Sequence, residues 1–252
     1  MPQDEFPHYI EFRHVYKTFD KPVLADSNFY VDGGQTVAII GRSGVGKSVT
    51  LAHIMGFLKP DNGRVIVAHE DTTDFDETEL RRIRKKVTMV FQSGALFDSL
   101  TAAENVLFSL ELRDDYDEQN KEDVVNGLLK MVDIYDARDA YPADLSTGYK
   151  RAVAIARALA AQPECILYDE PTTMVDPIMS DHLADLMLRL KRQLRLTSVV
   201  VTHDLDLMYR VADRVVFLHQ GQVIFFGPVQ DLEKSDNPNI QQFLALDHVN
   251  TT

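Results

Sequence analysis

The chain has 252 residues and a formal net charge of −13, and 45% of its residues are hydrophobic and 26% charged. This composition is ordinary for a globular protein, and the length favours one domain or one domain with an embedded subdomain. The negative charge disfavours nucleic acid as the main partner, no apolar run approaches the roughly 18 residues that span a bilayer, and the acidic N-terminus lacks a secretory signal. The single cysteine, Cys165, excludes an intrachain disulfide and suits a reducing compartment.

The N-terminal residues are typical of β-structure. Residues 9–19 alternate apolar and polar side chains and residues 28–31 are also β-type, which predicts antiparallel strands with a turn near Pro22. A tight turn at 32–35 leads into a predicted central strand at 36–40.

A glycine-rich octet follows that strand. Residues 41–48 are Gly-Arg-Ser-Gly-Val-Gly-Lys-Ser, which fits the phosphate-binding pattern G-x-x-x-x-G-K-[ST], and a helix is predicted at 47–57. The glycines allow a nest of inward-pointing N–H groups, and the helix adds free N–H donors and the positive end of its dipole. Lys47 would reach the β- and γ-phosphates and Ser48 would ligate Mg²⁺. The alternative is a glycine-rich turn without a ligand.

The next segment predicts a strand, a loop, a helix and a strand in turn. The strands lie at 64–68 and 87–91, and an acidic loop at 70–77 precedes a basic helix at 78–86. The basic run 81–86 invites a nucleic-acid function, but in a chain of net charge −13 we interpret it as a solvated helix face that balances the acidic loop.

Residues 95–150 are charge-rich and helical, with no convincing strand. Helices are predicted at 102–112, 119–134 and 149–161, the last rich in alanine and arginine. The predicted organisation is a single domain over 1–252 with an α/β core at 1–94 and 155–246, an inserted helical subdomain at 95–154 and a tail at 247–252.

The C-terminal half alternates buried strands with helices. Strands are predicted at 166–168 and 198–202, helices at 177–193, 204–212 and 238–246, and a hairpin at 214–226. This alternation predicts a parallel sheet with helices on both faces and the antiparallel strands packed beside it.

Several predicted strands end on residues that phosphoryl transfer uses. One leads into the phosphate loop, and the others end at Gln92, at Asp169 with Glu170, and at His203. Parallel strands bring their carboxyl ends to one edge of a sheet, where ligands bind. Asp169 would hold Mg²⁺ directly or through water, and Glu170 would polarise the attacking water. Gln92 would orient that water or touch the metal, and His203 would contact the γ-phosphate. Taken singly, an Asp-Glu pair is a common helix cap and a lone histidine a common structural residue, but their order behind a phosphate loop favours a hydrolytic site.

These motifs, in this order, resemble those of the ATP-binding cassette (ABC) ATPases, the nucleotide-binding subunits of transporters, over residues 9–245. The resemblance implies an α/β P-loop NTPase fold with a RecA-like parallel core, an antiparallel β subdomain and an inserted helical subdomain. It also implies hydrolysis of ATP with Mg²⁺. The site residues that it implies are Phe19, Gly41, Arg42, Ser43, Gly44, Val45, Gly46, Lys47, Ser48, Val49, Ser146 and Gly148 for the nucleotide, Ser48, Gln92 and Asp169 for Mg²⁺, and Glu170, His203 and Gln92 for catalysis.

Some of these positions depart from the family pattern or admit another interpretation. Phe19 stands where the family has an aromatic that stacks on adenine, although an aromatic in a β-rich segment can also face the core. The signature, Leu-Ser-Gly-Gly-Gln in the family, has Thr147 and Tyr149 in place of glycine and glutamine, which leaves open how closely this loop approaches ATP. Ser146 and Gly148, expected at the γ-phosphate, are kept, whereas the D-loop, residues 173–176, begins Thr-Met-Val rather than Ser-Ala-Leu.

The resemblance also implies partners. In the family the signature completes the site of the opposite subunit, so one motif set implies a head-to-tail homodimer with ATP at two interface sites. An integral membrane permease would dock on an apolar groove formed by the Q-loop region, residues 91–101, and the helical subdomain, which places the chain peripherally at the cytoplasmic face of the bacterial inner membrane. No nucleic acid is expected as a partner.

The segment 91–101, Phe-Gln-Ser-Gly-Ala-Leu-Phe-Asp-Ser-Leu-Thr, resembles the ATPases of MCE-type, Mla-like phospholipid transport systems, as do residues 104–106 and 239–244. This resemblance predicts that the chain powers phospholipid transport between bacterial membranes together with an MCE-domain protein. The alternatives are an importer for another substrate, an amino acid or a metal, and, less favoured, a soluble ABC ATPase that acts on DNA or ribosomes.

Overall fold

The computed structural model describes residues 6–113 and 115–248. Its strands are β1 (Ile10–Thr18), β2 (Pro22–Val31), β3 (Thr36–Ile40), β4 (Asn62–Val67), β5 (Glu70–Asp71), β6 (Val87–Val90), β7 (Cys165–Asp169), β8 (Thr197–Val201), β9 (Arg214–His219) and β10 (Gln222–Pro228). Its α-helices are α1 (Lys47–Ile54), α2 (Glu77–Lys86), α3 (Ala102–Glu111), α4 (Lys121–Met131), α5 (Thr147–Ala160), α6 (Pro177–Leu194), α7 (Leu205–Val211) and α8 (Pro238–His248). Of the predicted tail at 247–252, residues 247 and 248 belong to α8 and residues 249–252 lie outside the described residues.

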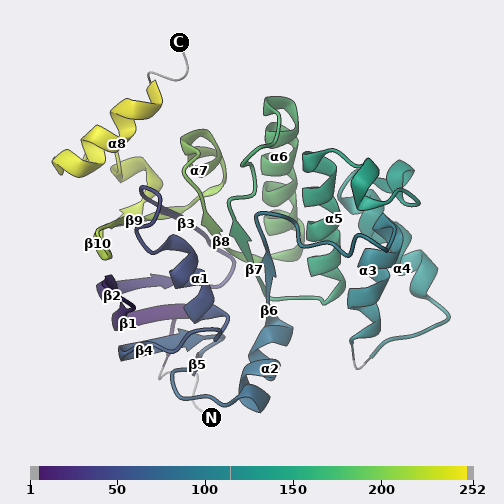
Figure 1. Ribbon diagram of the computed structural model, residues 1–252, viewed down its shortest axis with the longest axis horizontal. Coiled ribbons are helices and arrows are strands. Elements are labelled where there is room, and N and C mark those ends of the chain that lie inside the picture. The colour runs from purple at the N-terminus through teal and green to yellow at the C-terminus, as the bar shows by residue number, and fades with distance from the viewer. Residues whose placement is uncertain (1–5, 114, 249–252) are drawn as a thin grey trace.

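Two sheets form the frame of the molecule (Figure 1). The larger sheet has six strands in the order β10-β9-β3-β8-β7-β6, and the smaller has four in the order β2-β1-β4-β5. In the larger sheet β9, β3, β8, β7 and β6 run parallel, and only the edge strand β10 is antiparallel to its neighbour. The smaller sheet is antiparallel throughout. The predicted fold class, a parallel α/β core with an antiparallel β subdomain, is confirmed.

The strands of the larger sheet are short and apolar, and they are buried on both faces. All five residues of β3 and all five of β8 are buried. In β7 alternate side chains enter different cores, because Ile166 and Tyr168 pack with α5 and α6 whereas Cys165 and Leu167 pack with α1 and the smaller sheet. Helices therefore cover both faces, and the carboxyl ends of β3, β6, β7 and β8 lie at one edge.

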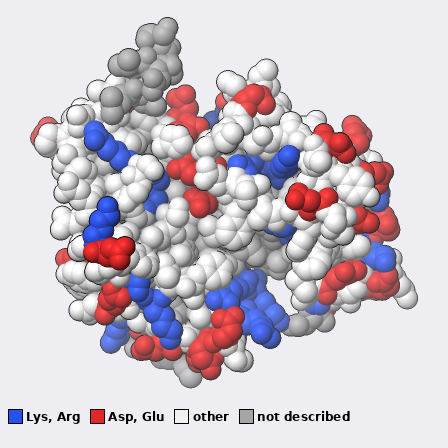
Figure 2. Space-filling model, viewed as in Figure 1, with Lys and Arg blue, Asp and Glu red and all other residues white. Residues whose placement is uncertain are grey.

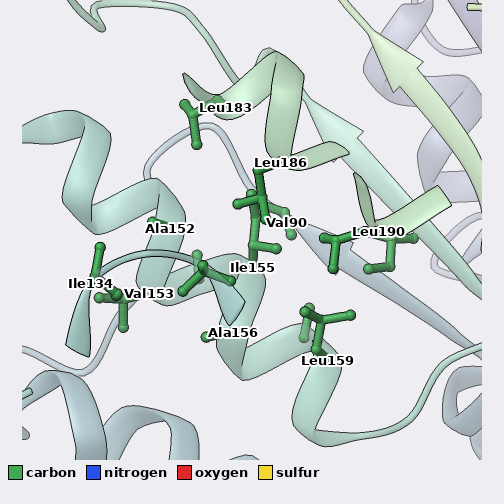
Figure 3. Close-up of a cluster of buried hydrophobic side chains, with 14 of the residues drawn as sticks. Val90, Ile134, Ala152, Val153, Ile155, Ala156, Leu159, Leu183, Leu186 and Leu190 are labelled. Atoms are coloured by element: carbon green, nitrogen blue, oxygen red, sulfur yellow. The ribbon is translucent and has the colours of Figure 1, made fainter. Parts of the chain in front are cut away.

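Helices α3 and α4 form a helical part beyond the edge strand β6, and α5 joins it to the core (Figure 1). One cluster of buried side chains runs through both parts. Figure 3 shows a portion of it, in which Leu183, Leu186 and Leu190 of α6 lie beside Val90 of β6 and Ile155 of α5. Since α5 packs against both α3 and β6, the expected subdomain boundary at 154 falls inside one continuous helix.

Some elements differ from those expected. The helix after the phosphate loop ends at Ile54 rather than at 57, because Gly56 adopts a φ of +66° and the N–H of Phe57 donates to the carbonyl of Ala52. The segment expected as an acidic loop contributes the two-residue edge strand β5, which pairs with β4.

Basic side chains of helix α2 form ion pairs with nearby acidic residues. Arg82 donates to both carboxylate oxygens of Glu70 at 2.9 and 2.6 Å, and Arg84 donates to Glu77 at 2.6 Å. Figure 2 shows basic and acidic atoms side by side along the lower edge of the molecule, where α2 lies. These pairings agree with a solvated helix face. No helix of the described ranges is long and apolar enough to cross a membrane.

Candidate active site

The predicted phosphate loop lies between β3 and α1. Gly41 and Gly46 have φ of +145° and +111°, and a Cβ there would lie 2.3 Å from the carbonyl oxygen of Leu218 or 2.9 Å from that of Val23. Only glycine fits both the dihedral angles and the space. Helix α1 begins directly after Gly46 with no side-chain cap, so its first N–H groups point toward the loop and are available to a ligand.

The ammonium group of Lys47 lies inside this loop. Its Nζ donates to the carbonyl oxygen of Gly41 at 2.8 Å and lies 3.8 Å from a carboxylate oxygen of Glu170. Burial lowers the pKa of Lys47, and the negative charges of Glu170 and Asp169 oppose that shift. A buried cation held between backbone carbonyls and carboxylates is placed to receive the oxygens of a phosphate group.

Ser48 and Asp169 offer oxygen atoms that suit a hard cation. The Ser48 hydroxyl donates to the Asp169 carboxylate at 3.4 Å, and Gln92 borders the cavities that adjoin both residues. Burial and then the neighbouring charge of Glu170 raise the pKa of Asp169. Within residues 6–113 and 115–248 no cluster of three or more His, Cys, Asp or Glu side chains is placed to hold a metal. One carboxylate, one hydroxyl and one amide fit Mg²⁺, which keeps several water or phosphate oxygens as ligands.

Glu170 is held in a defined position at the end of β7. Its φ of +49° is left-handed, which is uncommon for a residue other than glycine, and its N–H donates to the carbonyl of Val201 at 2.8 Å. Its carboxylate lies 2.8 Å from Nδ1 of His203 and accepts a hydrogen bond from the Thr173 hydroxyl at 3.2 Å. These contacts offset the backbone strain and keep the carboxylate beside Lys47, at the opening of the phosphate loop.

A cavity of about 580 Å³ opens at this edge of the sheet. The phosphate loop contributes the largest share of its lining, which comprises Ser43, Gly44, Gly46, Lys47, Ser48, Val49, Phe19, Val23, Gln92, Glu170, Thr173 and His203. Phe19 is 53% exposed at the rim, so the core-facing alternative for this residue does not hold. Of the predicted nucleotide residues, Gly41, Arg42 and Val45 belong to the loop but do not border the cavity.

The two signature residues expected at the γ-phosphate do not border this cavity either. Ser146 is the N-cap of α5, where its hydroxyl oxygen accepts from the N–H of Tyr149 at 3.2 Å. Gly148 faces α6, because a Cβ at this position would lie 2.9 Å from Cβ of Met179. Within one chain, both residues therefore serve the capping and packing of α5.

The structure also contains contacts that the motifs did not predict. Arg42 donates to the side-chain oxygen of Gln242 in α8 at 3.0 Å. Arg157 of α5 donates to the carbonyl oxygens of Ala95 at 2.6 Å and of Gly94 at 2.9 Å, which ties the Q-loop segment to the signature helix. Figure 1 shows this segment leaving β6 and crossing α5 on its way to α3. The residues in each contact are far apart in the chain, so no local sequence spacing predicts these contacts. The one sequence feature that could have drawn attention to them is Arg157 itself, an arginine within an alanine-rich helix.

The comparisons with known proteins agree with this geometry. The ABC transporter family matches residues 24–173. The methionine import ATP-binding protein MetN 1 of Pseudomonas savastanoi pv. phaseolicola is 38% identical over 244 residues, which cover 94% of this chain and 73% of that protein. MetN 2 of Pseudomonas syringae pv. tomato is 40% identical over 228 residues, which cover 88% of this chain and 68% of that protein.

Solved structures match over most of their length as well. The ATP-binding cassette MJ0796, solved as a dimer in a post-hydrolysis state with ADP and Pi, superposes with a TM-score of 0.80 at 33% identity and covers 87% of this chain and 98% of its own. The cbiO1 protein of Clostridium perfringens, part of the ABC transporter complex cbiONQ, superposes with a TM-score of 0.84 at 26% identity and covers 96% and 97%.

The prediction of a phospholipid transport system is wrong, because the relatives are named as methionine import proteins. The MCE-domain partner was predicted from the same resemblance, so it is not supported either. The structure shows local structural roles for part of the Q-loop segment, whose resemblance predicted the lipid system. The fully buried Asn105 accepts from the N–H of Phe97 and donates to the carbonyls of Phe97, Leu100 and Thr101, and Thr101 also forms the capping box of α3 with Glu104. Thr101 and Asn105 therefore have roles in local structure that do not depend on the transported substrate.

The other resemblance to the lipid systems, in residues 239–244, has a similar explanation. Ile240 and Leu244 are buried against Phe217 and Met208, so this pattern describes how α8 packs on the larger sheet. The assignment of the chain to a family does not depend on the lipid prediction. The matched family segment, the relatives and the arrangement of the strand ends agree that this chain belongs to the ABC transporter family, as one of its ATP-binding, ATP-hydrolysing subunits.

Proposed function

We propose that this ATPase powers an importer for an amino acid, with methionine as the transported substrate. The observation that carries the proposal is the similarity to proteins named for methionine import, at 36–40% identity over 88–94% of the chain. The cargo need not touch an ATP-binding subunit, so the assignment rests on similarity along the whole chain and not on a pocket.

The residues at the sheet edge suggest how ATP is bound and cleaved. We assign adenine to the exposed ring of Phe19 and the triphosphate to the phosphate loop, where Lys47 and the first N–H groups of α1 face it. Ser48, Asp169 and Gln92 would hold Mg²⁺, which supplies charge neutralisation at the β- and γ-phosphates when it is bound.

Glu170 is assigned to the attacking water. Its carboxylate now contacts His203 and lies 3.8 Å from Lys47. A γ-phosphate attracts both of these groups, because each can donate to its oxygens. As they turn to the phosphate, the Glu170 carboxylate becomes available to accept a hydrogen bond from water, while the Thr173 hydroxyl keeps it in place. His203 then stabilises the charge that develops on the γ-phosphate.

A second copy of the chain would complete each site. Ser146 and Gly148 do not border the cavity at the phosphate loop of their own chain, which supports a role at the nucleotide of the partner. Met174 of the D-loop segment is 88% exposed and Ile178 at the start of α6 is 72% exposed, so this side offers an apolar contact surface. The dimeric state of the related cassette MJ0796 supports the same arrangement.

A membrane permease is the second proposed partner. Phe97 and Phe108 are exposed by 43% and 42%, and their rings pack edge to face at 4.7 Å on the surface of the helical part. An exposed aromatic pair beside the Q-loop segment is a suitable anchor for a permease helix. Docking there would place the chain peripherally on the cytoplasmic face of the inner membrane.

Uptake measurements test the importer assignment. Deletion of the gene in its host should abolish energy-dependent uptake of radiolabelled methionine and leave uptake of an unrelated amino acid unchanged. Expression of the parent chain should restore methionine uptake, and expression of Glu170→Gln should not. Unchanged methionine uptake in the deletion strain would overturn the substrate assignment but would leave the ATPase assignment intact.

A further inference from the structure

A second cavity, of about 600 Å³, lies beside the ATP cavity, between the Q-loop segment and the signature helix. One wall is formed by Phe91, Gln92 and Ser93, and a second by Asp169 and the D-loop segment. The third wall is the first turn and a half of α5. The cavity shares Gln92 and Thr173 with the ATP cavity, so the two are direct neighbours.

The α5 wall is cationic. Thr147, Lys150 and Arg151 lie at positions i, i+3 and i+4, which places them on one face of the helix, and all three border the cavity. This face lies at the N-terminal end of α5, where the helix dipole is positive. Two positive side chains face one carboxylate, that of Asp169, so the charged residues of the lining sum to +1 in a chain of net charge −13.

Arg151 is the residue that most clearly indicates a ligand in this cavity. It is only 4% exposed, and its Nε is buried without a hydrogen-bond partner in the described part of the chain. Its guanidinium lies beside the backbone of Gly94 and makes no ion pair with a described carboxylate. Burial without a counter-charge lowers the pKa of Arg151, which reflects the cost of holding this cation out of water. An oxyanion in the cavity would remove that cost.

We propose that this cavity is a second oxyanion site, separate from the phosphate loop, and that it binds inorganic phosphate. A tetrahedral phosphate can accept hydrogen bonds from the Arg151 guanidinium, the Lys150 ammonium and the Thr147 hydroxyl at once. Because the cavity adjoins the ATP cavity at Gln92 and Thr173, phosphate released by hydrolysis has a short path to Arg151. The Asp169 carboxylate faces the same space and favours a ligand that stays on the α5 side.

Calorimetric titration with inorganic phosphate, in the absence of nucleotide, separates this site from the phosphate loop. The parent chain should bind two phosphates per chain. Lys47→Ala, which impairs the phosphate loop, and Arg151→Met, which removes the proposed site, should each retain one. Arg192→Met removes the same charge from an exposed position of α6 outside the cavity lining and should behave like the parent.

Two results would overturn the proposal: parental stoichiometry in Arg151→Met, or the loss of all phosphate binding in Lys47→Ala. If Arg151→Met fails to fold, Lys150→Met serves in its place, because Lys150 is partly exposed and its loss should weaken the second binding event about tenfold. Unchanged affinity in Lys150→Met would then contradict the site. The titration is independent of the importer assignment, so the two proposals fail separately.

Discussion

Two regions of this chain carry motifs for the same reaction, but the fold prepares them to different degrees. At the edge of the larger sheet, Lys47, Glu170 and His203 come from separate elements, and Glu170 already lies within contact distance of both Lys47 and His203. At the start of α5, Ser146 and Gly148 are occupied with capping and packing and do not border the cavity at the phosphate loop. The first region has a geometry prepared for phosphate chemistry, whereas the second presents a surface that another molecule can use. This difference is what we expect of half a composite site.

The strongest change to the prepared region is Glu170→Gln. The amide can still accept from the Thr173 hydroxyl but cannot act as a base, so the rate of ATP hydrolysis should fall by about 10²–10⁴-fold. ATP affinity should be retained, because Lys47 and the loop are untouched. Phosphate release and equilibrium dialysis measure the two quantities. Glu111→Gln, at an exposed position of α3, is the matched control, and hydrolysis at the parental rate in Glu170→Gln would refute the role of this carboxylate.

The packing of the signature helix is tested by a pair of glycines. A Cβ at Gly148 would lie 2.9 Å from Cβ of Met179, so Gly148→Ala should lower the free energy of unfolding by about 1–3 kcal/mol. A Cβ at Gly127, inside α4, has no atom within 4 Å, so Gly127→Ala should raise it by roughly 0.5–1 kcal/mol. Urea denaturation of both variants measures the difference. Equal effects would mean that Gly148 is not needed for packing.

The rim of the ATP cavity is tested at Phe19. Loss of a stacking ring costs about 1–3 kcal/mol per base, so Phe19→Ala should weaken ATP binding about 5- to 150-fold. Binding of inorganic triphosphate, which has no base, should stay within about twofold of the parent. Phe57→Ala is the control, since Phe57 is equally exposed but does not border the cavity. Equal loss of both ligands would point to a structural effect of Phe19 instead.

The smallest expected effect is a pH dependence at Asp169. Its pKa is raised in the folded protein by burial and by Glu170, so the folded state holds this proton more tightly than the unfolded chain does. Its contribution to stability is therefore present at low pH and is lost as the pH rises through the raised pKa. In the absence of Mg²⁺, the stability advantage of Asp169→Asn over the parent should grow across that interval, as followed by urea denaturation at several pH values. A constant difference would contradict the shift.

The sequence predicted the prepared region better than the signature region, for a physical reason. Phosphate binding imposes local requirements, such as glycine where φ is positive and a carboxylate where an apolar strand ends, and these appear as short patterns. The contacts of Arg157 with the Q-loop carbonyls and of Arg42 with α8 join distant segments, so no local pattern contains them. The fold followed from the alternation of buried strands and helices.

The lipid prediction failed for the opposite reason. The segment 91–101 has a distinctive pattern, but Asn105 holds its backbone at Phe97, Leu100 and Thr101, and Thr101 forms the capping box of α3. Such a pattern describes local structure and does not identify the cargo, which this subunit need not touch.

Mixing two inactive variants tests whether the signature completes the site of a second copy. Lys47→Ala disables a phosphate loop, and Ser146→Arg blocks a signature. In a mixed dimer both lesions meet in one composite site and the other site is intact. We expect each variant alone to be inactive and an equal mixture to regain about a quarter of the parental rate of phosphate release, since half of the dimers are mixed and each has one good site. A mixture that stays inactive would contradict a site shared between two chains.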